Sequence, residues 1–275
     1  MIKAGLIGYP LRNSLSPLIF KILSARSGAR FEYSLLNTRG PALSRTLERM
    51  KALGWSGCNV TLPLKEKIIP FLDAVSGEAR ALGAVNAVRI KNGRLCGCNT
   101  DVSAVRFALK EAGCRPRGRE SVIWGAGGAA RAAAWALARG GAVAVEIHNR
   151  TARRGTALAR EFSALFPRTR FAARAFGAVP GAAATIFVNA TPLGMYGPLA
   201  RGMECRGPSG SFYLDFAYGR RGTPFLERRD GTAIAGLDLL VYQALKSAEW
   251  FGGPRAASRE IVKLKNDIKR CLAPF

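Results

Sequence analysis

The sequence predicts an α/β fold with a Rossmann-type, doubly wound dinucleotide-binding sheet, and three observations support this prediction. The apolar run 121–124 leads into Gly125-Ala126-Gly127-Gly128-Ala129-Ala130, a G-x-G-x-x-A pattern. Its glycines permit a tight turn and let backbone N–H groups approach a pyrophosphate, and its small third position lets helix pack on strand. An alanine-rich stretch follows, ends at a glycine pair, and gives way to a strand-like segment at 143–147. These segments form a β-α-β unit; the alternative is a glycine-rich turn in a nucleotide-free α/β domain.

The end of the second strand of this unit indicates which dinucleotide is bound. An NAD site usually has Asp or Glu there for the ribose 2′-OH. This chain instead has Asn149-Arg150-Thr151, followed by Arg153 and Arg154. A guanidinium grips a phosphate in a bidentate manner, so the sequence favours NADP (NADPH). The alternative is that Arg153 and Arg154 only form a solvated face.

The composition is that of a globular protein. The chain has 275 residues, of which 48% are hydrophobic, and this length suits one large or two modest domains. No apolar stretch is long and uncharged enough to span a bilayer, and the N-terminus lacks the pattern of a signal peptide. We therefore expect a soluble, cytoplasmic protein with no membrane partner.

Metal and nucleic-acid binding are both poorly supported. The six cysteines include no C-x-x-C pair, and with one histidine, His148, a zinc site has too few ligands, so no metal is expected. The net charge of +24 favours polyanion binding in principle. The basic residues are scattered, however, and no nucleic-acid-binding motif is present. Specific binding of nucleic acid remains the remote alternative.

The remaining elements follow from apolar periodicity and turn residues. In the first part of the chain we expect strands at 2–8, 31–36, 57–62 and 81–90, helices from 17, at 41–53 and at 66–74, and a hairpin at Asn92-Gly93. A helix beginning at 101 precedes the β-α-β unit. After it we expect strands at 184–188 and 211–216, a helix from 236 and a last helix at 257–272.

Several polar residues stand where these elements end. Ser14 and Ser16 are two apart in an extended loop and point the same way, which suits an acceptor-rich ligand, although Ser16 before a proline also fits a helix N-cap. Asn59 and Thr61 share one face of a strand end. Lys65 follows that strand and, taken alone, fits a surface lysine.

Three further polar positions come later in the chain. Asn86 lies in an apolar strand and needs a partner or a ligand. Asp101 opens a helix, where the helix dipole alone would favour an acid. Gln243 lies on the helix that begins near 236. The strands at 184–188 and 211–216 both end in polar turns, the position at which open α/β sheets bind ligands.

In combination these motifs resemble the shikimate dehydrogenase family over essentially the whole chain. The segments that carry the resemblance are 14–17, 57–65, 83–86, 99–101, 125–130, 149–151 and 189–195, with Gln243. The resemblance implies reversible reduction of 3-dehydroshikimate to shikimate by NADPH, on the route to chorismate and the aromatic amino acids, without a metal. It also implies a substrate-binding domain of residues 1–102 plus 237–275, an NADP-binding domain of residues 103–236 and an active site in the cleft between them.

The resemblance assigns roles to residues by motif. Ser14 and Ser16 would bind the substrate carboxylate, and Lys65 and Asp101 would form the catalytic pair. Other substrate-binding positions are Asn59, Thr61, Asn86, Tyr218 and Gln243. The cofactor-binding positions are Gly125, Ala126, Gly127, Gly128, Ala129, Ala130, Asn149, Arg150, Thr151, Arg154, Thr191 and Gly236. The nearest rival is a relative that oxidises quinate or uses NAD, and the expected assembly is a monomer or a homodimer.

Overall fold

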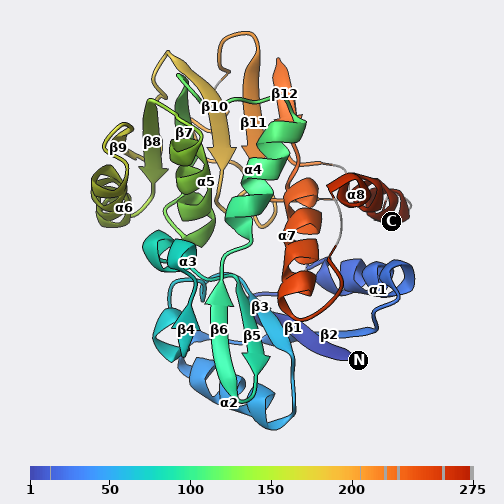
Figure 1. The fold of residues 1–275 in the computed structure, drawn as a ribbon. Coiled ribbons are helices and arrows are strands. Elements are labelled where there is room, and N and C mark those ends of the chain that lie inside the picture. Colours follow the sequence, from blue (N-terminus) through green and yellow to red (C-terminus); the bar gives the residue numbers. More distant parts are fainter. Residues whose placement is uncertain (13, 205, 220–221, 228–229, 256–257, 273–275) are drawn as a thin grey trace. The chain divides into compact units, whose positions relative to one another are not determined.

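The computed structural model describes residues 1–12, 14–204, 206–219, 222–227, 230–255 and 258–272, with the backbone alone at 258–261, 265 and 272. The chain divides into two compact units (Figure 1). The first contains residues 1–100 and the C-terminal stretch from Leu240. The second contains residues 101–239. Each unit is built around its own six-stranded sheet, so the α/β class with a Rossmann-like parallel sheet is confirmed.

The sheet of the first unit is mixed. Its strands are β1 (Ile2–Gly8), β2 (Phe31–Asn37), β3 (Gly57–Val60), β4 (Ala74–Val75), β5 (Ala87–Lys91) and β6 (Arg94–Cys98), in the order β2-β1-β3-β5-β6-β4. Strand β5 runs antiparallel to both β3 and β6, whereas β1 is parallel to β2 and β3. The predicted hairpin at Asn92-Gly93 is confirmed, since both residues have positive φ (52° and 73°), as a type I′ turn requires.

The helices of the first unit are α1 (Ser16–Ser27), α2 (Leu43–Ala52), α3 (Gly77–Leu82), the part of α7 (Gly236–Trp250) from Leu240 onward, and α8 (Ser258–Leu272). Short 3-10 turns lie at η1 (Gly40–Ala42) and η2 (Ile69–Phe71). As the spacing predicted, Leu43, Leu47 and Met50 face inward from α2 and pack into the core with Ile7 and Val60. This buried face holds α2 against the sheet.

Two predictions of local structure in this unit are wrong, and so is the alternative that Ser16 caps α1. Residues 66–74 form turns and η2 instead of a helix, because Pro70 lacks the N–H that a helix interior needs and Ala74 pairs with β6 instead. Residues 81–90 are not one strand. Ser76 caps α3 by accepting from the Ala79 N–H, and Gly83 ends that helix in the left-handed conformation. Ser16 is the first helical residue of α1, and its N-cap is Leu15.

The sheet of the second unit is parallel throughout. Its strands are β7 (Glu120–Trp124), β8 (Ala144–Asn149), β9 (Arg170–Ala175), β10 (Ala184–Asn189), β11 (Ser211–Asp215) and β12 (Gly231–Ile234), in the order β12-β11-β10-β7-β8-β9. The strand order reverses between β7 and β10, which makes that gap the switch point at which such sheets bind ligands. The predicted strands at 121–124, 143–147, 184–188 and 211–216 are confirmed within a residue or two, whereas no prediction covered the edge strands β9 and β12.

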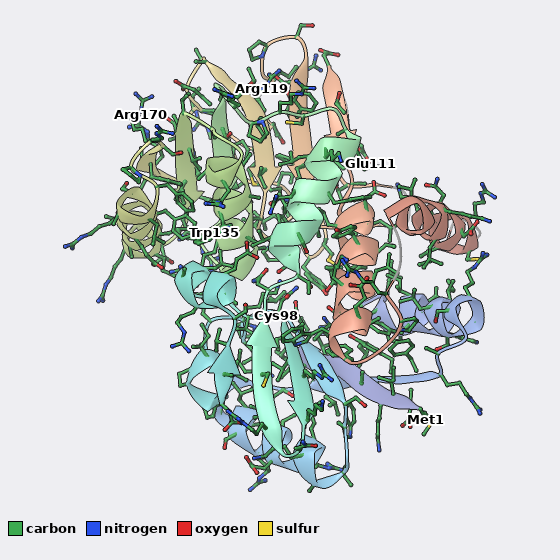
Figure 2. All side chains as sticks on the ribbon, in the orientation of Figure 1. Met1, Cys98, Glu111, Arg119, Trp135 and Arg170 are labelled. Carbon is green, nitrogen blue, oxygen red and sulfur yellow. The ribbon has the colours of Figure 1, made fainter. Side chains whose placement is uncertain are left out.

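The helices of the second unit are α4 (Asp101–Glu111), α5 (Gly128–Arg139) and α6 (Ala152–Leu165). Helices α4 and α5 lie side by side over one face of the sheet (Figure 1). Trp135 on α5, labelled in Figure 2, packs edge-on against Phe162 and Phe166 from α6 and the turn after it. A second aromatic cluster of Trp124, Phe187, Tyr213 and Phe225 fills the core beside β7, β10 and β11. Rigid packing on both sides therefore fixes the strand ends at the switch point.

Candidate functional site

The turn between β7 and α5 has the geometry of a phosphate cradle. Gly125 has a φ of +115°, and a Cβ there would lie 2.9 Å from the carbonyl oxygen of Ala190 and 3.4 Å from Thr191 Cγ2. Only glycine therefore fits between this turn and the end of β10. Gly127 is the N-cap of α5 in an extended conformation, and Ala126, Gly128 and Ala130 are buried. The N-terminus of α5 therefore presents the unpaired backbone N–H groups and positive dipole end that hold a pyrophosphate.

The arginines after β8 lie next to this cradle. The Asn149 side chain donates to the carbonyl of Thr151 (2.8 Å) and shapes the turn into α6. Arg154 Nη2 donates to the carbonyl oxygen of Ala126 at 3.4 Å, which brings its guanidinium to the glycine turn. Arg150 and Arg153 are exposed. Residues 149–160 contain no acid, so nothing in this stretch repels a 2′-phosphate.

The ends of β10 and β11 complete the same edge of the second sheet. Thr191 donates to Asn189 Oδ1 from both its N–H (3.0 Å) and its hydroxyl (2.7 Å). Gly236 opens α7 so close to β11 that a Cβ would lie 2.3 Å from the carbonyl oxygen of Ala217. Tyr218 follows Ala217 and is half-buried. The structure thus gathers the glycine turn, Arg154, Thr191 and Gly236 at the carboxyl ends of the parallel strands.

His148 lies at the end of β8 but is fully buried. Its ring is tilted against Trp124, and its Nε2 lies 3.3 Å from Glu146 Oε2. Burial lowers the pKa of His148 below its ordinary value, and the hydrogen bond with Glu146 opposes that shift. The imidazole is therefore a neutral packing group rather than a ligand of the cofactor.

In the first unit, two loops that carry predicted substrate residues are joined directly. The N–H of Tyr9 donates to the carbonyl of Leu62 (2.9 Å), and the N–H of Thr61 donates to the carbonyl of Ile7 (2.9 Å). A Cβ on Gly8 would lie 2.4 Å from Thr61 Cγ2, so glycine is required for this approach. Both loops contain a cis proline, at 10 and 63.

The two serines lie where the first of these loops enters α1. Ser14 Oγ accepts from the N–H of Ser16 (3.3 Å), and Ser16 is buried. The N-cap of α1 is Leu15, so Ser16 does not stand at the position that the helix-cap alternative needs. The role of Ser16 as a ligand residue stays a prediction.

Asn59, Asn86 and Gln243 belong to one buried chain of hydrogen bonds. Asn59 Nδ2 donates to Ser247 Oγ (2.7 Å) and lies 3.4 Å from Gln243 Oε1, while its Oδ1 accepts from the Tyr33 hydroxyl (2.9 Å). Asn86 Oδ1 accepts from the N–H of Thr100 (2.6 Å), and its Nδ2 donates to Thr100 Oγ1 (3.0 Å). The Thr100 and Ser247 hydroxyls lie 3.3 Å apart, which closes the chain.

Asn59 has several partners within the protein. It is 3% exposed, and three protein oxygens lie within reach of its side-chain nitrogen. These contacts hold the amide in place, and its contact with the substrate stays a prediction. Gln243 is only partly buried, and its Nε2 donates to the carbonyl of Leu240 (2.9 Å), so it stands nearer the surface of the same chain.

Lys65 lies in the turn after β3 and is half-buried. Its carbonyl accepts from the N–H of Val85 (2.8 Å). Because Val85 directly precedes Asn86, the backbone of Lys65 lies close to Asn86. Asp101 is the covalent neighbour of Thr100, opens α4 in the second unit and is 6% exposed. A carboxylate in the first turn of a helix is stabilised by the helix dipole.

Ser247 and Tyr33, which belong to the hydrogen-bonded chain in the first unit, were not predicted from the sequence. Ser247 is fully buried and follows Gln243 by four residues on α7, so helical spacing alone would have placed both on one face. Tyr33 is stacked on Phe20 at 4.0 Å and uses its hydroxyl on Asn59. Nothing in the pattern of β2 singles out Tyr33.

Other kinds of site are scarce among the described residues. No group of three or more His, Cys, Asp or Glu side chains in this part of the chain could hold a metal ion. Among the helices that the structure describes, none is long and apolar enough to cross a membrane. Arg119 and Arg170 lie at the amino-terminal edge of the second sheet (Figure 2), where Arg170 pairs with Glu120 at 3.4 Å. These two arginines lie at the opposite end of the strands from the phosphate cradle.

Comparisons with known proteins agree with this geometry. A model of the shikimate dehydrogenase substrate binding domain matches residues 6–88. The chain is 38% identical over 263 residues to the shikimate dehydrogenase (NADP(+)) of Moorella thermoacetica, covering 92% of this chain and 88% of that protein. The structure matches Thermus thermophilus shikimate 5-dehydrogenase in complex with NADP(H) and shikimate with a TM-score of 0.80 and 31% identity, over 98% of this chain and 100% of that one.

A related enzyme with another substrate in its name also matches. Quinate dehydrogenase from Corynebacterium glutamicum in complex with NAD gives a TM-score of 0.81 at 27% identity, over 96% of this chain and 97% of that one. The same fold therefore occurs in proteins named for different polyol acids and different nicotinamide cofactors.

Proposed function

This chain belongs to the shikimate dehydrogenase family, and from that premise we propose how its residues divide the work of reducing 3-dehydroshikimate to shikimate with NADPH. The observation that carries the proposal is the edge of the second sheet, where a glycine cradle lies beside Arg154 and no acid follows β8. NADPH, when bound, supplies the hydride that reduces the C3 carbonyl. The enzyme is an oxidoreductase of the route to aromatic amino acids.

The residues of the second unit hold the cofactor. The N–H groups at the start of α5 receive the pyrophosphate, and Arg150 and Arg154 surround the 2′-phosphate. Asn149 and Thr151 shape this turn, while Thr191 and Gly236 line the far side of the switch point. Tyr218 faces the substrate from the loop after β11.

The residues of the first unit hold the substrate and move the proton. Ser14 and Ser16 donate to the carboxylate, and Thr61, Asn86 and Gln243 bind hydroxyls. Hydride transfer leaves an alkoxide at C3, and the ammonium of Lys65 stabilises and then protonates that oxygen. Asp101 orients Lys65 and accepts from the neighbouring hydroxyl.

The competing function is oxidation of quinate, with NAD as cofactor, which the match to quinate dehydrogenase makes specific. Quinate has an additional hydroxyl at C1 on a saturated ring, so the two substrates differ where Ser14, Ser16 and Tyr218 would bind. The decisive experiment compares kcat/KM for shikimate and quinate, each with NADP+ and with NAD+. We expect the pair shikimate and NADP+ to be preferred by at least about tenfold, and a preference for quinate or for NAD+ would overturn the proposal.

The assembly as a monomer or homodimer, the cytoplasmic location and the absence of a metal requirement belong to the same proposal. Sedimentation of the purified protein tests the first. Activity after extensive treatment with a chelator tests the last, and loss of activity that added metal restores would contradict it.

A further inference from the structure

We propose that Asp215 is a positioning residue for the nicotinamide half of the cofactor site, because its carboxylate fastens the loop after β10 to the loop after β11. This inference rests on the proposed function, since it concerns the site in which NADPH would bind. Asp215 was not among the residues that the sequence pointed to as ligands or catalysts. It is the last residue of β11 and is fully buried.

The geometry of Asp215 begins with the register of the sheet. Asn189 and Asp215 are paired residues at the ends of the adjacent parallel strands β10 and β11. Asn189 Nδ2 donates to Asp215 Oδ1 at 2.8 Å. The same oxygen accepts from the N–H of Ala217 (2.8 Å), and Oδ2 accepts from the hydroxyl of Thr223, which is also buried. Three donors, one from the end of β10 and two from the loop after β11, thus converge on one carboxylate.

Asn189 also restrains the loop after β10. Its Nδ2 also donates to the carbonyl of Leu193 (3.0 Å), and its Oδ1 accepts from the N–H and hydroxyl of Thr191. The amide therefore has both of its N–H groups and its oxygen in use. Rotation of Asn189 away from Asp215 would release the whole 191–193 turn.

On the other side, the carboxylate restrains the loop after β11. Ala217, held through its N–H, immediately precedes Tyr218. The carbonyl of Ala217 packs against Gly236 so closely that no side chain fits there. Thr223 holds the far end of the same loop. Tyr218 therefore lies between two points that are both tied to Asp215.

The topology indicates which half of the dinucleotide these loops face. The adenosine 2′-phosphate belongs at the end of β8, where Arg150 and Arg154 are. A dinucleotide crosses the switch point between β7 and β10 with its pyrophosphate on the start of α5. The other half, which carries the nicotinamide, then lies over β10 and β11. Burial raises the pKa of Asp215 to about 7, and the hydrogen bonds from Thr223, Ala217 and Asn189 oppose that shift.

The test uses substitutions that keep shape. Thr223→Val removes one donor to the carboxylate, Thr223→Ser keeps it, and Asp215→Asn keeps the outline of the side chain without its charge. Thr232→Val, at an exposed position on β12, is the matched control. Each variant is assayed for kcat, for the Michaelis constant of the keto acid substrate, and for the dissociation constants of NADPH and of adenosine 2′,5′-bisphosphate. The last ligand carries only the adenosine half with its 2′-phosphate.

We expect Thr223→Val and Asp215→Asn to weaken NADPH binding or to raise the Michaelis constant of the keto acid substrate by about tenfold, the effect of one hydrogen bond to a charged group. Binding of adenosine 2′,5′-bisphosphate should stay within about twofold of wild type, and Thr223→Ser should restore most of the loss. Equal weakening of both nucleotides, or no change in any of these quantities, would overturn the inference. If Asp215→Asn does not fold, the two Thr223 variants decide.

Failure of the proposed function would give a different result from failure of the inference about Asp215. Wild-type protein that binds NADPH but does not reduce 3-dehydroshikimate would contradict the substrate assignment. The comparison of the two nucleotides would still test the role of Asp215, because it needs no turnover.

Discussion

The two units bury polar groups at their strand ends in different ways. In the first unit the buried chain of hydrogen bonds is neutral. It joins amide and hydroxyl groups of Tyr33, Asn59, Ser247, Thr100 and Asn86. In the second unit the corresponding centre is a carboxylate, Asp215, that receives three donors. Burial of a neutral hydrogen-bonded chain removes no charge from water. Burial of a carboxylate does, so the carboxylate needs hydrogen-bond donors to offset that cost.

This difference fits what each unit is proposed to bind. Shikimate presents hydroxyls, which neutral donors and acceptors in fixed positions can distinguish. Under the proposal, NADPH is held mainly by the N–H groups at the start of α5 and by arginines, and the carboxylate under β10 and β11 holds loops rather than ligand. Lys65 is the charged group that the proposal places at the reaction in the first unit.

Replacing Lys65 gives the largest expected effect and tests whether charge in the first unit is catalytic. Lys65→Ala should lower turnover by about 10²- to 10⁴-fold, as for loss of a general acid, and leave the melting temperature nearly unchanged. Steady-state kinetics and thermal unfolding measure the two quantities. Lys67→Ala, at an exposed position two residues later, is the control and should keep wild-type turnover. Near-normal turnover of Lys65→Ala would remove the lysine from the mechanism.

Arg150 tests the charges that hold the cofactor in the second unit. Loss of a phosphate contact typically costs about 1.5 to 3 kcal/mol, so Arg150→Ala should raise the KM for NADPH by roughly ten- to a hundredfold. The kinetics with NADH should change little, because NADH has no 2′-phosphate. Arg139→Ala, at the exposed last turn of α5, provides the control. If both cofactors lost affinity equally, Arg150 would serve packing or adenine stacking instead.

A substitution of Ser247 tests the neutral hydrogen-bonded chain of the first unit. Ser247→Ala leaves the N–H of Asn59 without its 2.7 Å partner, although the carbonyl of Asn86 lies 3.3 Å from the same nitrogen. Because that second acceptor remains, we expect a loss of about 1 kcal/mol in the free energy of unfolding, at the low end for an orphaned buried group. Urea unfolding measures it. Ser163→Ala, on the exposed face of α6, should change the same quantity by less than about 0.5 kcal/mol; a similar loss in both variants would show that Ser247 has no special role.

The pH dependence of stability distinguishes Asp215 from the uncharged groups of the first unit. Burial raises the pKa of Asp215 from its ordinary value of 3.8 to about 7. Between these values the folded protein keeps a proton that the unfolded chain has released, so this group makes the protein less stable as the pH rises from about 4 to about 7. The slope that one group contributes is at most about 1.4 kcal/mol per pH unit.

The measurement is the free energy of unfolding of the wild type and of Asp215→Asn across this range. The difference between them should shift in favour of the variant as the pH rises. Taking the difference cancels the opposite slope of His148, whose lowered pKa makes the protein less stable as the pH falls. A pH-independent difference would show that Asp215 is not protonated in the folded protein.

The sequence by itself determined the features that depend on local chemistry. Gly125 and Gly127 could be identified because a turn that lets backbone N–H groups approach a phosphate favours glycine, and the structure shows that Gly125 has no room for a Cβ. The absence of an acid after β8 is a property of the sequence alone. The inward face of α2 followed from its 3.6-residue spacing. The polar residues at strand ends were also visible, because a polar group in an apolar run needs a partner.

Only the tertiary structure decided which partner each of those groups has. Asn59 and Ser247 are 188 residues apart, and Asn189 meets Asp215 because parallel strands place their ends side by side. Local pattern carries no information about such distances, and so it could not show that the Asn59 amide bonds to Ser247. The wrongly predicted helix at 66–74 has the same origin, since pairing with β6 at Ala74 and the missing N–H of Pro70 outweigh the helical propensity of that segment.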